Sequence, residues 1–224
     1  MARRKHVILE QTVAAIRRRH GPAALVRAAE AAPKVLALPT GFRSLDAALG
    51  IGGLPRGQIT EFLGPLTAGK TTLAACLVAQ TQRLGEEAAY LDLGGVLDAD
   101  YLARCGVDLD RLVVVRPRHS HQALEVALHL VARARPGLLV LDAVEDLEAS
   151  PLDPQWAQGA LRQLVGRLRR SPTVFLALHH APAKEATYPL GFDLGEHAWL
   201  RLQLGKVRWL RRHRDVWGYE VEVQ

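Results

Sequence analysis

Gly64-Pro65-Leu66-Thr67-Ala68-Gly69-Lys70-Thr71 fits the G-x-x-x-x-G-K-[ST] pattern of a phosphate-binding loop. Residues 58–63 before it predict a buried strand, and residues 71–84 after it predict a helix with an apolar stripe. The two glycines let the backbone curl, so that successive N–H groups and the helix N-terminus face a polyphosphate. The sequence therefore predicts a nucleotide-binding loop between a strand and a helix.

Two side chains of this loop carry predicted roles in holding the ligand. Lys70 is expected to reach the β- and γ-phosphates, and Thr71 is expected to bind a Mg²⁺ ion. A glycine-rich loop arising by chance is the alternative, but the flanking strand and helix and a later strand that ends in Asp142 argue against it. The expected cofactors are Mg²⁺ and either ATP or ADP, between which the sequence does not decide.

Composition places the chain among globular proteins. Its 224 residues are 49% hydrophobic, which is enough for one α/β core with small attachments. No apolar run approaches the length of a membrane span, and the first residues lead into a charged amphipathic segment, so we expect a cytoplasmic protein without membrane contact. Cys76 and Cys105 lack the spacing of a metal site or disulfide framework, and are interpreted as small buried core residues.

Apolar periodicity predicts strands that alternate with helices. The expected strands after the loop are residues 88–93, 112–115, 138–141 and 173–178, and the expected helices are residues 99–105, 122–135 and 156–169. Each strand is almost wholly apolar, so the predicted fold class is α/β, with a mostly parallel twisted sheet and helices on both faces. Alternation from residue 199 onward predicts antiparallel strands that extend the sheet, and residues 36–57 predict a turn-rich lead into the first strand.

The N-terminal segment is expected to be an appendage of this core. Residues 7–20 carry apolar residues at helical spacing, and Gly21-Pro22 stops the pattern, which predicts an amphipathic helix with a basic face. The predicted organisation is therefore an N-terminal helix with its connecting segment over residues 1–35, followed by a core over residues 36–224.

Positive charge is concentrated near both ends of the chain. The formal net charge of +6 favours an anionic partner, although an excess of this size is weak evidence by itself. Residues 206–214 mix cations with Trp209, a composition typical of nucleic-acid surfaces and also of a solvated strand face. The candidates for contact with a nucleic acid or a phosphate are Arg208, Arg211, Arg212 and Arg214.

Several short segments follow one another in a characteristic order. They are Thr40-Gly41, Ser44-Leu45-Asp46, Ala48-Leu49-Gly50, Gly52-Gly53-Leu54-Pro55-Arg56-Gly57, Gly64-Pro65, Gly69-Lys70-Thr71-Thr72, Leu97-Asp98, Tyr101, Gly106-Val107-Asp108, Gln122-Ala123-Leu124-Glu125 and residues 138–142. Together they resemble the RecA family of recombinases, from the N-terminal helix to the end of the chain. The resemblance implies a RecA-like P-loop NTPase core.

The resemblance also implies a role for several residues around the nucleotide. Thr72 would join the phosphate-binding loop in contacting the ligand, and Asp98 and Tyr101 would flank the adenine, the latter by ring stacking. Asp142 would be the Walker B aspartate that holds the Mg²⁺ shell. His180 stands where the family has a glutamine that senses the γ-phosphate.

Contacts between protomers are implied as well. The basic tail lies near the region where lysines of one RecA protomer reach the γ-phosphate bound by its neighbour, so Arg211, Arg212 or Arg214 are candidates for that role. The N-terminal helix of RecA packs on the neighbouring subunit, which makes residues 1–35 a candidate for protomer docking in a homo-oligomer.

One departure from the family concerns hydrolysis. RecA proteins carry a glutamate two residues beyond the aspartate of the second strand, where it polarises the attacking water, and this chain has Gly94 at that position. Orienting and deprotonating the water contributes about 10²–10⁴-fold in rate, so we expect nucleotide binding with slow or absent hydrolysis. Glu145 or Asp146, just beyond Asp142, are alternative bases that the sequence leaves open.

A second departure concerns the two loops that bind DNA in RecA. The first, between Asp142 and Trp156, contains four acidic residues and no lysine or arginine. The second, residues 181–197, offers one lysine against three acidic residues. Since cationic contacts dominate binding to a phosphate backbone, we expect these loops to hold single strands poorly, and any DNA contact to use the basic tail.

These losses point toward a RecA-like paralogue of the ImuA type, also described as SulA-like, which serves DNA-damage-induced translesion synthesis in the SOS response. The favoured function is a nucleotide-gated accessory subunit of DNA repair with weak ATP hydrolysis, whose protein partner is a translesion polymerase or RecA. The alternative is an active DNA-dependent ATPase or recombinase acting on single-stranded DNA. A signalling regulator with a RecA-like core fits the phosphate-binding loop but not the segment around Asp98 and Tyr101.

Overall fold

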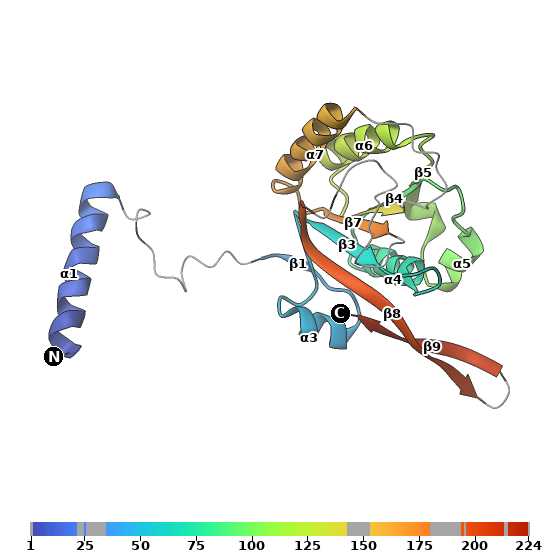
Figure 1. Ribbon diagram of the computed structural model, residues 1–224, viewed down its shortest axis with the longest axis horizontal. Helices are drawn as coiled ribbons and strands as arrows, with labels where there is room; N and C mark the ends of the chain where they lie inside the picture. Colours follow the sequence, from blue (N-terminus) through green and yellow to red (C-terminus); the bar gives the residue numbers. More distant parts are fainter. Residues whose placement is uncertain are drawn as a thin grey trace. The chain divides into compact units, whose positions relative to one another are not determined.

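The structure is a computed structural model that describes residues 2–21, 25, 35–142, 153–179, 194, 196–212 and 215–223. The chain divides into two compact units, Met1–Val35 and Leu36–Gln224. In the first unit, helix α1 spans Ala2–His20 and thus begins five residues before the predicted start. Basic residues fill its last turn, where they complement the helix dipole, and the Gly21 N–H closes the helix on the Arg17 carbonyl (Figure 1).

The second unit is built around a seven-stranded sheet in the order β5-β4-β6-β7-β3-β8-β9. Its strands are β3 (Ile59–Leu63), β4 (Ala88–Asp92), β5 (Leu112–Val115), β6 (Leu138–Asp142), β7 (Val174–His179), β8 (Ala198–Arg212) and β9 (Asp215–Val223). Neighbouring strands from β5 to β8 are parallel, and β8 pairs with β9 in antiparallel fashion. The predicted fold class is confirmed.

The predicted antiparallel C-terminal strands are confirmed by the pairing of β8 with β9. The sequence did not predict how this pair joins the sheet: β8 runs parallel to β3, with Thr60 opposite Leu200 and Phe62 opposite Leu202, and β9 reverses direction. Alternating polar and apolar residues indicate that one face of a strand is exposed, but they carry no information on the direction of its neighbour. The chain therefore adds one more parallel strand before the sheet ends in an antiparallel edge.

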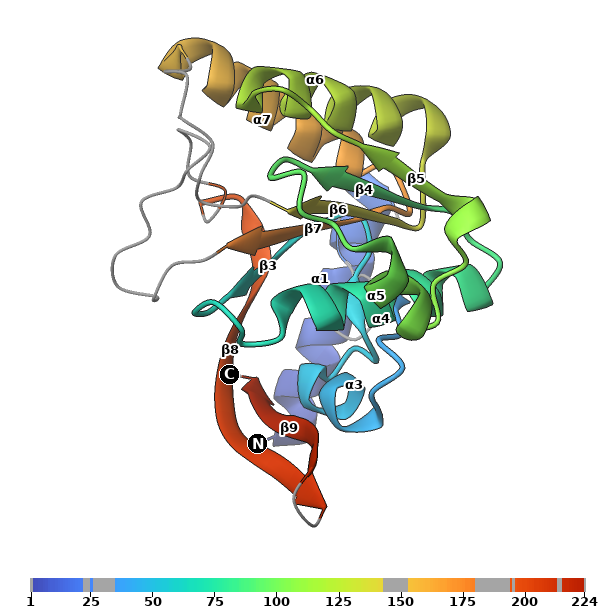
Figure 2. The same ribbon diagram turned by 90° about the vertical axis from the view of Figure 1, so that its right-hand side faces the viewer.

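Helices cover both faces of the sheet (Figures 1 and 2). Helices α4 (Lys70–Arg83) and α5 (Ala99–Arg104) lie on one face, and α6 (Ser120–His129), its π-helical continuation η3 (Leu130–Ala134) and α7 (Pro154–Leu168) lie on the other. Successive strand residues alternate between the two cores: Tyr90 packs in the cluster with α4, and Ala89 and Leu91 pack in the cluster with α6 and α7. The buried strands thus join two apolar cores.

The segment that precedes the phosphate-binding loop is more regular than predicted. It forms helix α3 (Arg43–Leu49), and the two-residue strands β1 (Ala37–Leu38) and β2 (Leu54–Pro55) pair with each other. Asp46 accepts hydrogen bonds from the Thr40 N–H at 2.9 Å and its hydroxyl at 2.7 Å, which fixes the turn into the helix. None of the seven helix residues is fully buried, so apolar periodicity gave little signal.

Two further expectations need correction. Cys76 and Cys105 are half-buried rather than buried, and the second is the C-cap residue of α5 rather than a position inside the helix. A 3₁₀ turn, η2 (Leu109–Arg111), links this region to β5. Within the described part of the chain, no helix combines the length and the apolar character that crossing a membrane requires.

Candidate nucleotide-binding site

The phosphate-binding loop connects the end of β3 to the start of α4, and its backbone uses conformations that favour glycine. Gly69 has φ 94° and forms the N-cap of α4, and Thr67 at the loop tip has φ 65°. A Cβ atom on Gly64 would lie 2.4 Å from the carbonyl oxygen of Leu204 on β8, a separation that no side chain tolerates. The sequence pattern therefore reflects a real steric requirement at the first glycine of the loop.

The ammonium group of Lys70 lies within the curl of this loop. The side chain is only 6% exposed, and its Nζ donates hydrogen bonds to the carbonyl oxygens of Gly64 at 2.6 Å and Pro65 at 2.8 Å. The backbone carbonyls thus hold the ammonium group inside the loop, where it could reach a phosphate oxygen of a bound nucleotide. A nucleotide would exchange at least one of these contacts for a stronger one to a charged oxygen.

Asp142 ends β6 on the other side of the site, and Tyr90 of β4 holds its carboxylate. The Tyr90 hydroxyl donates a hydrogen bond to Asp142 Oδ2 at 2.5 Å, and Asp142 is 9% exposed. Burial, followed by the charge of Asp142 and their hydrogen bond, raises the pKa of Tyr90 far above its usual range. The tyrosine therefore stays protonated and remains a donor, which fixes the orientation of the predicted metal ligand.

Asp92, which ends β4 beside Asp142, has a different task. Its carboxylate accepts hydrogen bonds from the N–H groups of Val96 at 3.2 Å and Leu97 at 3.3 Å, and its Oδ2 lies 3.1 Å from Arg116 Nε. It thereby holds the loop that leads from β4 to α5. Gly94 lies in this loop and is exposed.

The side of the site predicted to bind the base is formed by α5 and the first turn of α4. Asp98 is the N-cap residue of α5, where its Oδ1 accepts a hydrogen bond from the Tyr101 N–H at 3.0 Å. The Tyr101 hydroxyl lies 2.6 Å from Thr72 Oγ1, and the Arg104 guanidinium lies 5.8 Å from the centre of the Tyr101 ring. A hydrogen bond between side chains thus links the helix of the phosphate-binding loop to the predicted stacking residue.

These elements enclose a hollow of about 330 Å³, within the range of small-molecule sites. Of the predicted residues, Leu66, Thr67, Gly69, Lys70, Thr71, Thr72, Asp98, Tyr101 and Asp142 line it. Gly64, Pro65 and Ala68 shape the loop but are not among the lining residues. Val96, Leu97, Leu102, Leu178 and His179 also line the hollow, and the sequence patterns had not singled them out for it.

Other candidate residues lie outside what the structure describes. Glu145, His180 and Arg214 fall outside the described residues. Arg208, Arg211 and Arg212 belong to β8, and the description covers their backbone but not their side chains. The proposed roles of all six residues therefore stay predictions.

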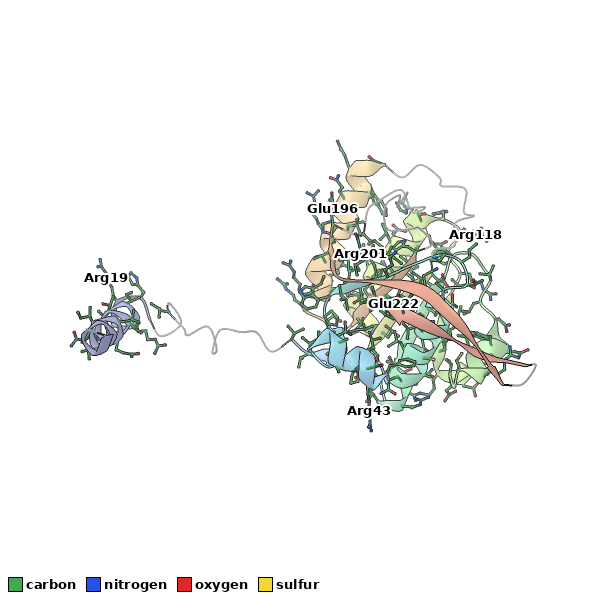
Figure 3. The ribbon with its side chains drawn as sticks, turned by 60° about the horizontal axis from the view of Figure 1, so that its bottom comes forward. Arg19, Arg43, Arg118, Glu196, Arg201 and Glu222 are labelled. Carbon is green, nitrogen blue, oxygen red and sulfur yellow. The ribbon has the colours of Figure 1, made fainter. Side chains whose placement is uncertain are left out.

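A buried charged group joins three neighbouring strands below the hollow. Glu61 on β3 is fully buried, accepts a hydrogen bond from Arg201 Nε of β8 at 2.9 Å, and has its Oε1 3.3 Å from His179 Nε2 of β7. The two atoms lie at ion-pair distance but without hydrogen-bond geometry. Figure 3 labels Arg201 on β8. Strand order, which spacing in the sequence does not reveal, brings these residues together.

The fold and the site define a class of protein. A mostly parallel sheet carries a phosphate-binding loop after one strand and an aspartate at the carboxyl end of another, and the two face the same hollow. This is the arrangement of P-loop proteins of the nucleoside-triphosphatase class.

Comparison with known proteins identifies the family within this class. The family model described as RecA N-terminal domain matches residues 7–176. The chain is 33% identical over 241 residues to the Protein RecA of Chloroflexus aurantiacus, covering 98% of this chain and 69% of that protein. It is 34% identical over 245 residues to the Protein RecA of Geobacter sulfurreducens, covering 100% of this chain and 72% of that protein. The chain belongs to the RecA family, and the resemblance stated from its sequence is confirmed.

Membership sets the general character of the protein. The chain is a RecA-like protein of DNA recombination or repair, from a family that binds ATP with Mg²⁺. The comparisons do not distinguish the ImuA type within this family, and they assign no role to an individual residue of the chain.

Proposed function

We propose that the protein binds Mg²⁺ with ATP or ADP in the described hollow and acts as a nucleotide-gated accessory subunit of DNA repair, with weak ATP hydrolysis. The observation that carries the proposal is that Lys70, inside the phosphate-binding loop, and Asp142, at the end of β6, line the same hollow. When bound, Mg²⁺ would neutralise phosphate charge between Thr71 and Asp142. Lys70 would bind the phosphates, and Tyr101 would provide a surface for the base.

Weak hydrolysis is supported by the carboxylates around the hollow. Among the described lining residues only Asp98 and Asp142 carry a carboxylate, and the first caps α5 while the second is held by Tyr90. Asp92 is committed to the loop before α5 and to Arg116. Gly94 supplies no group that orients a water molecule, so no lining residue that the structure describes is free to give the usual base contribution of about 10²–10⁴-fold.

Nucleotide binding is the first test of this proposal. Equilibrium dialysis of the purified chain with Mg·ATP and Mg·ADP is expected to show saturable uptake of at least one of them. Absence of uptake of both would overturn the proposal.

The second test concerns hydrolysis. We expect slow ATP turnover by the wild-type chain, and at least about tenfold faster turnover by Gly94→Glu, because the substitution returns a carboxylate to the loop next to the hollow. Gly94 is absent from the residues with positive φ, so the backbone accepts a side chain there. Gly95→Ala, at a φ of 64°, is a control that disturbs the same loop without adding a carboxylate.

The alternative function is an active DNA-dependent ATPase or recombinase. It is favoured by the extent of the relationship, because the matches to RecA proteins span 96–100% of this chain. Single-stranded DNA that strongly stimulates ATP turnover by the wild-type chain would support this alternative. Retention of nucleotide without stimulation would support the accessory subunit.

Partners follow from the same proposal. We infer that the chain associates with a translesion polymerase or RecA, or with further copies of itself through α1, whose last turn is basic. Direct DNA contact is proposed for the basic tail, at Arg208, Arg211, Arg212 and Arg214. Sedimentation with and without Mg·ATP measures self-association, and a salt titration of DNA affinity measures the number of phosphate contacts.

A further inference from the structure

Helices α4 and α5 meet at successive levels behind the predicted base-binding side of the hollow. At the first level, Thr72 Oγ1 lies 2.6 Å from the Tyr101 hydroxyl. Further along α4 and just past the end of α5, a Cβ atom on Gly106 would lie 3.9 Å from Ala79 Cβ, an ordinary van der Waals contact. The chain at the end of α5 therefore also lies against α4.

Two cysteines lie between these contacts. Cys76 follows Thr72 by four residues and Cys105 follows Tyr101 by four residues, so each lies about one helical turn beyond the first contact and faces the same way. Both are free thiols, and Cys105 lies near enough to raise the pKa of the Cys76 thiol. The pair thus lies where the end of α5 meets α4, with Cys76 inside α4 and Cys105 as the C-cap residue of α5.

Solvent and small reagents have access to this pair. Both cysteines are half-buried, and Cys76 also lines a hollow of about 450 Å³ between α3, α4 and the two last strands. The other lining residues of this hollow include Phe42, Leu45, Leu73, Leu204, Val221 and Val223. A small disulfide reagent can therefore approach Cys76 through this hollow, which Gly69 of the phosphate-binding loop also lines.

We propose that Cys76 and Cys105 form a reversible thiol–disulfide pair that fastens α5 to α4 beside the nucleotide site. The co-reactant is a low-molecular-weight disulfide such as oxidised glutathione. One cysteine thiolate attacks a reagent sulfur and releases one thiol, and the second thiolate then attacks the mixed disulfide and releases the other. Two cysteine S–H bonds are lost and one S–S bond forms, while two electrons and two protons pass to the reagent as two thiols.

The environment of Cys76 sets the pace of this exchange. Burial, and after it the neighbouring Cys105, raises the pKa of the Cys76 thiol, and Arg83 offsets part of this effect. Since the thiolate is the attacking form, a thiol with a raised pKa reacts slowly at neutral pH and faster as the pH rises. We therefore expect the rate of oxidation to increase steadily from about pH 7 to pH 9.

The consequence for nucleotide exchange rests on the proposed function. An S–S bond of about 2.05 Å prevents the two helices from separating one turn away from Tyr101. A nucleotide whose base stacks on Tyr101 would then have to dissociate from a less mobile site. We expect the disulfide to slow nucleotide release about threefold to tenfold, because a site held in its bound arrangement loses fewer conformations on binding.

The chemical test is independent of nucleotide. The reduced full-length chain is titrated with oxidised glutathione and analysed by intact mass spectrometry and non-reducing electrophoresis. The expected product is a monomer that has lost two hydrogens and both titratable thiols, whereas Cys105→Ser is expected to give only a glutathione adduct. Stable glutathione adducts or disulfide-linked dimers as the main wild-type product would overturn the proposal.

The functional test uses release of a fluorescent ADP analogue from the oxidised and reduced forms. Slower release from the oxidised wild type is expected, with no change on oxidant treatment of the double variant Cys76→Ser/Cys105→Ser. Equal release rates from fully oxidised and reduced wild type would exclude the effect on the nucleotide site. Failure of the reduced chain to bind the analogue would instead count against the proposed function, and the mass measurement would still decide whether the disulfide forms.

Discussion

The central sheet has an amino edge, where its parallel strands begin, and a carboxyl edge, where they end. The charged side chains at these two edges have different kinds of partner. At the amino edge, Arg56 holds Glu86 through two hydrogen bonds of 2.7 and 2.8 Å and also donates to the Pro172 carbonyl at 3.1 Å. At the carboxyl edge, Lys70 bonds backbone carbonyls of its own loop, and Asp142 is held by a tyrosine. The first set joins separate strand starts to one another, and the second faces a hollow where a ligand can replace its contacts.

The difference fits the proposed function, in which the amino edge stabilises the fold and the carboxyl edge is the place proposed for the ligand. Open α/β sheets bind ligands at the carboxyl ends of their strands, and the charged groups of this protein follow that division. Substitutions at the two edges should therefore separate losses of stability from losses of binding.

The largest effect is expected where the two tasks coincide, at the first glycine of the phosphate-binding loop. Gly64→Ala would drive a methyl group into the Leu204 carbonyl, so we expect a loss of at least about 3 kcal/mol in the free energy of unfolding. Urea unfolding followed by circular dichroism measures it. Gly205→Ala, whose Cβ would meet nothing within 4 Å, is the matched control. Equal stability of the two variants would contradict the steric argument.

Lys70→Ala is expected to affect binding alone. Loss of the ammonium should weaken Mg·ATP and Mg·ADP binding at least about 100-fold, or about 2.7 kcal/mol, because a charge-assisted contact to phosphate disappears. The urea midpoint should change little, since the hydrogen bonds to the Gly64 and Pro65 carbonyls join the side chain to its own loop. Calorimetric titration measures the affinity, and unchanged binding would show that the nucleotide lies elsewhere.

Arg56→Ala is the counterpart at the amino edge. The Arg56 side chain is 12% exposed, and its removal leaves Glu86 without its paired charge, so we expect a loss of about 2 kcal/mol in stability. Nucleotide affinity should stay unchanged. Arg111→Ala, whose ion pair with Glu87 is far more exposed, should cost less than about 1 kcal/mol. A large loss of nucleotide affinity in Arg56→Ala would contradict the assignment of stability to the amino edge and of binding to the carboxyl edge.

The smallest expected effect sharpens the picture at the carboxyl edge. Tyr90→Phe keeps the buried ring but removes the donor to Asp142, and we expect about tenfold weaker binding of Mn²⁺ in the presence of ADP. ADP affinity measured in EDTA should not change, whereas a general structural defect would also lower it. Paramagnetic resonance of free Mn²⁺ provides the measurement. Equal Mn²⁺ affinity in both proteins would show that Tyr90 does not position the metal ligand.

Local patterns predicted much of this fold because its strands are almost wholly apolar and the phosphate-binding loop has steric requirements that only certain residues meet. The short helix α3 was not predicted because none of its residues is fully buried. The direction of β8 relative to β3 was not predicted because alternation of polar and apolar residues is the same in parallel and antiparallel strands. The contacts of Tyr90 with Asp142, and of Glu61 with Arg201, depend on which strands are neighbours. A tyrosine in an aliphatic strand and a glutamate in a buried one were the available signals.

The close approach of Gly64 to Leu204 also bears on the proposed nucleotide gating. The loop backbone and the carbonyl of β8 leave no free space between them, and the same strand continues into its pairing with β9. Under the proposed function, any shift of the loop on contact with a polyphosphate would press on β8, the strand that continues to Arg208, Arg211 and Arg212.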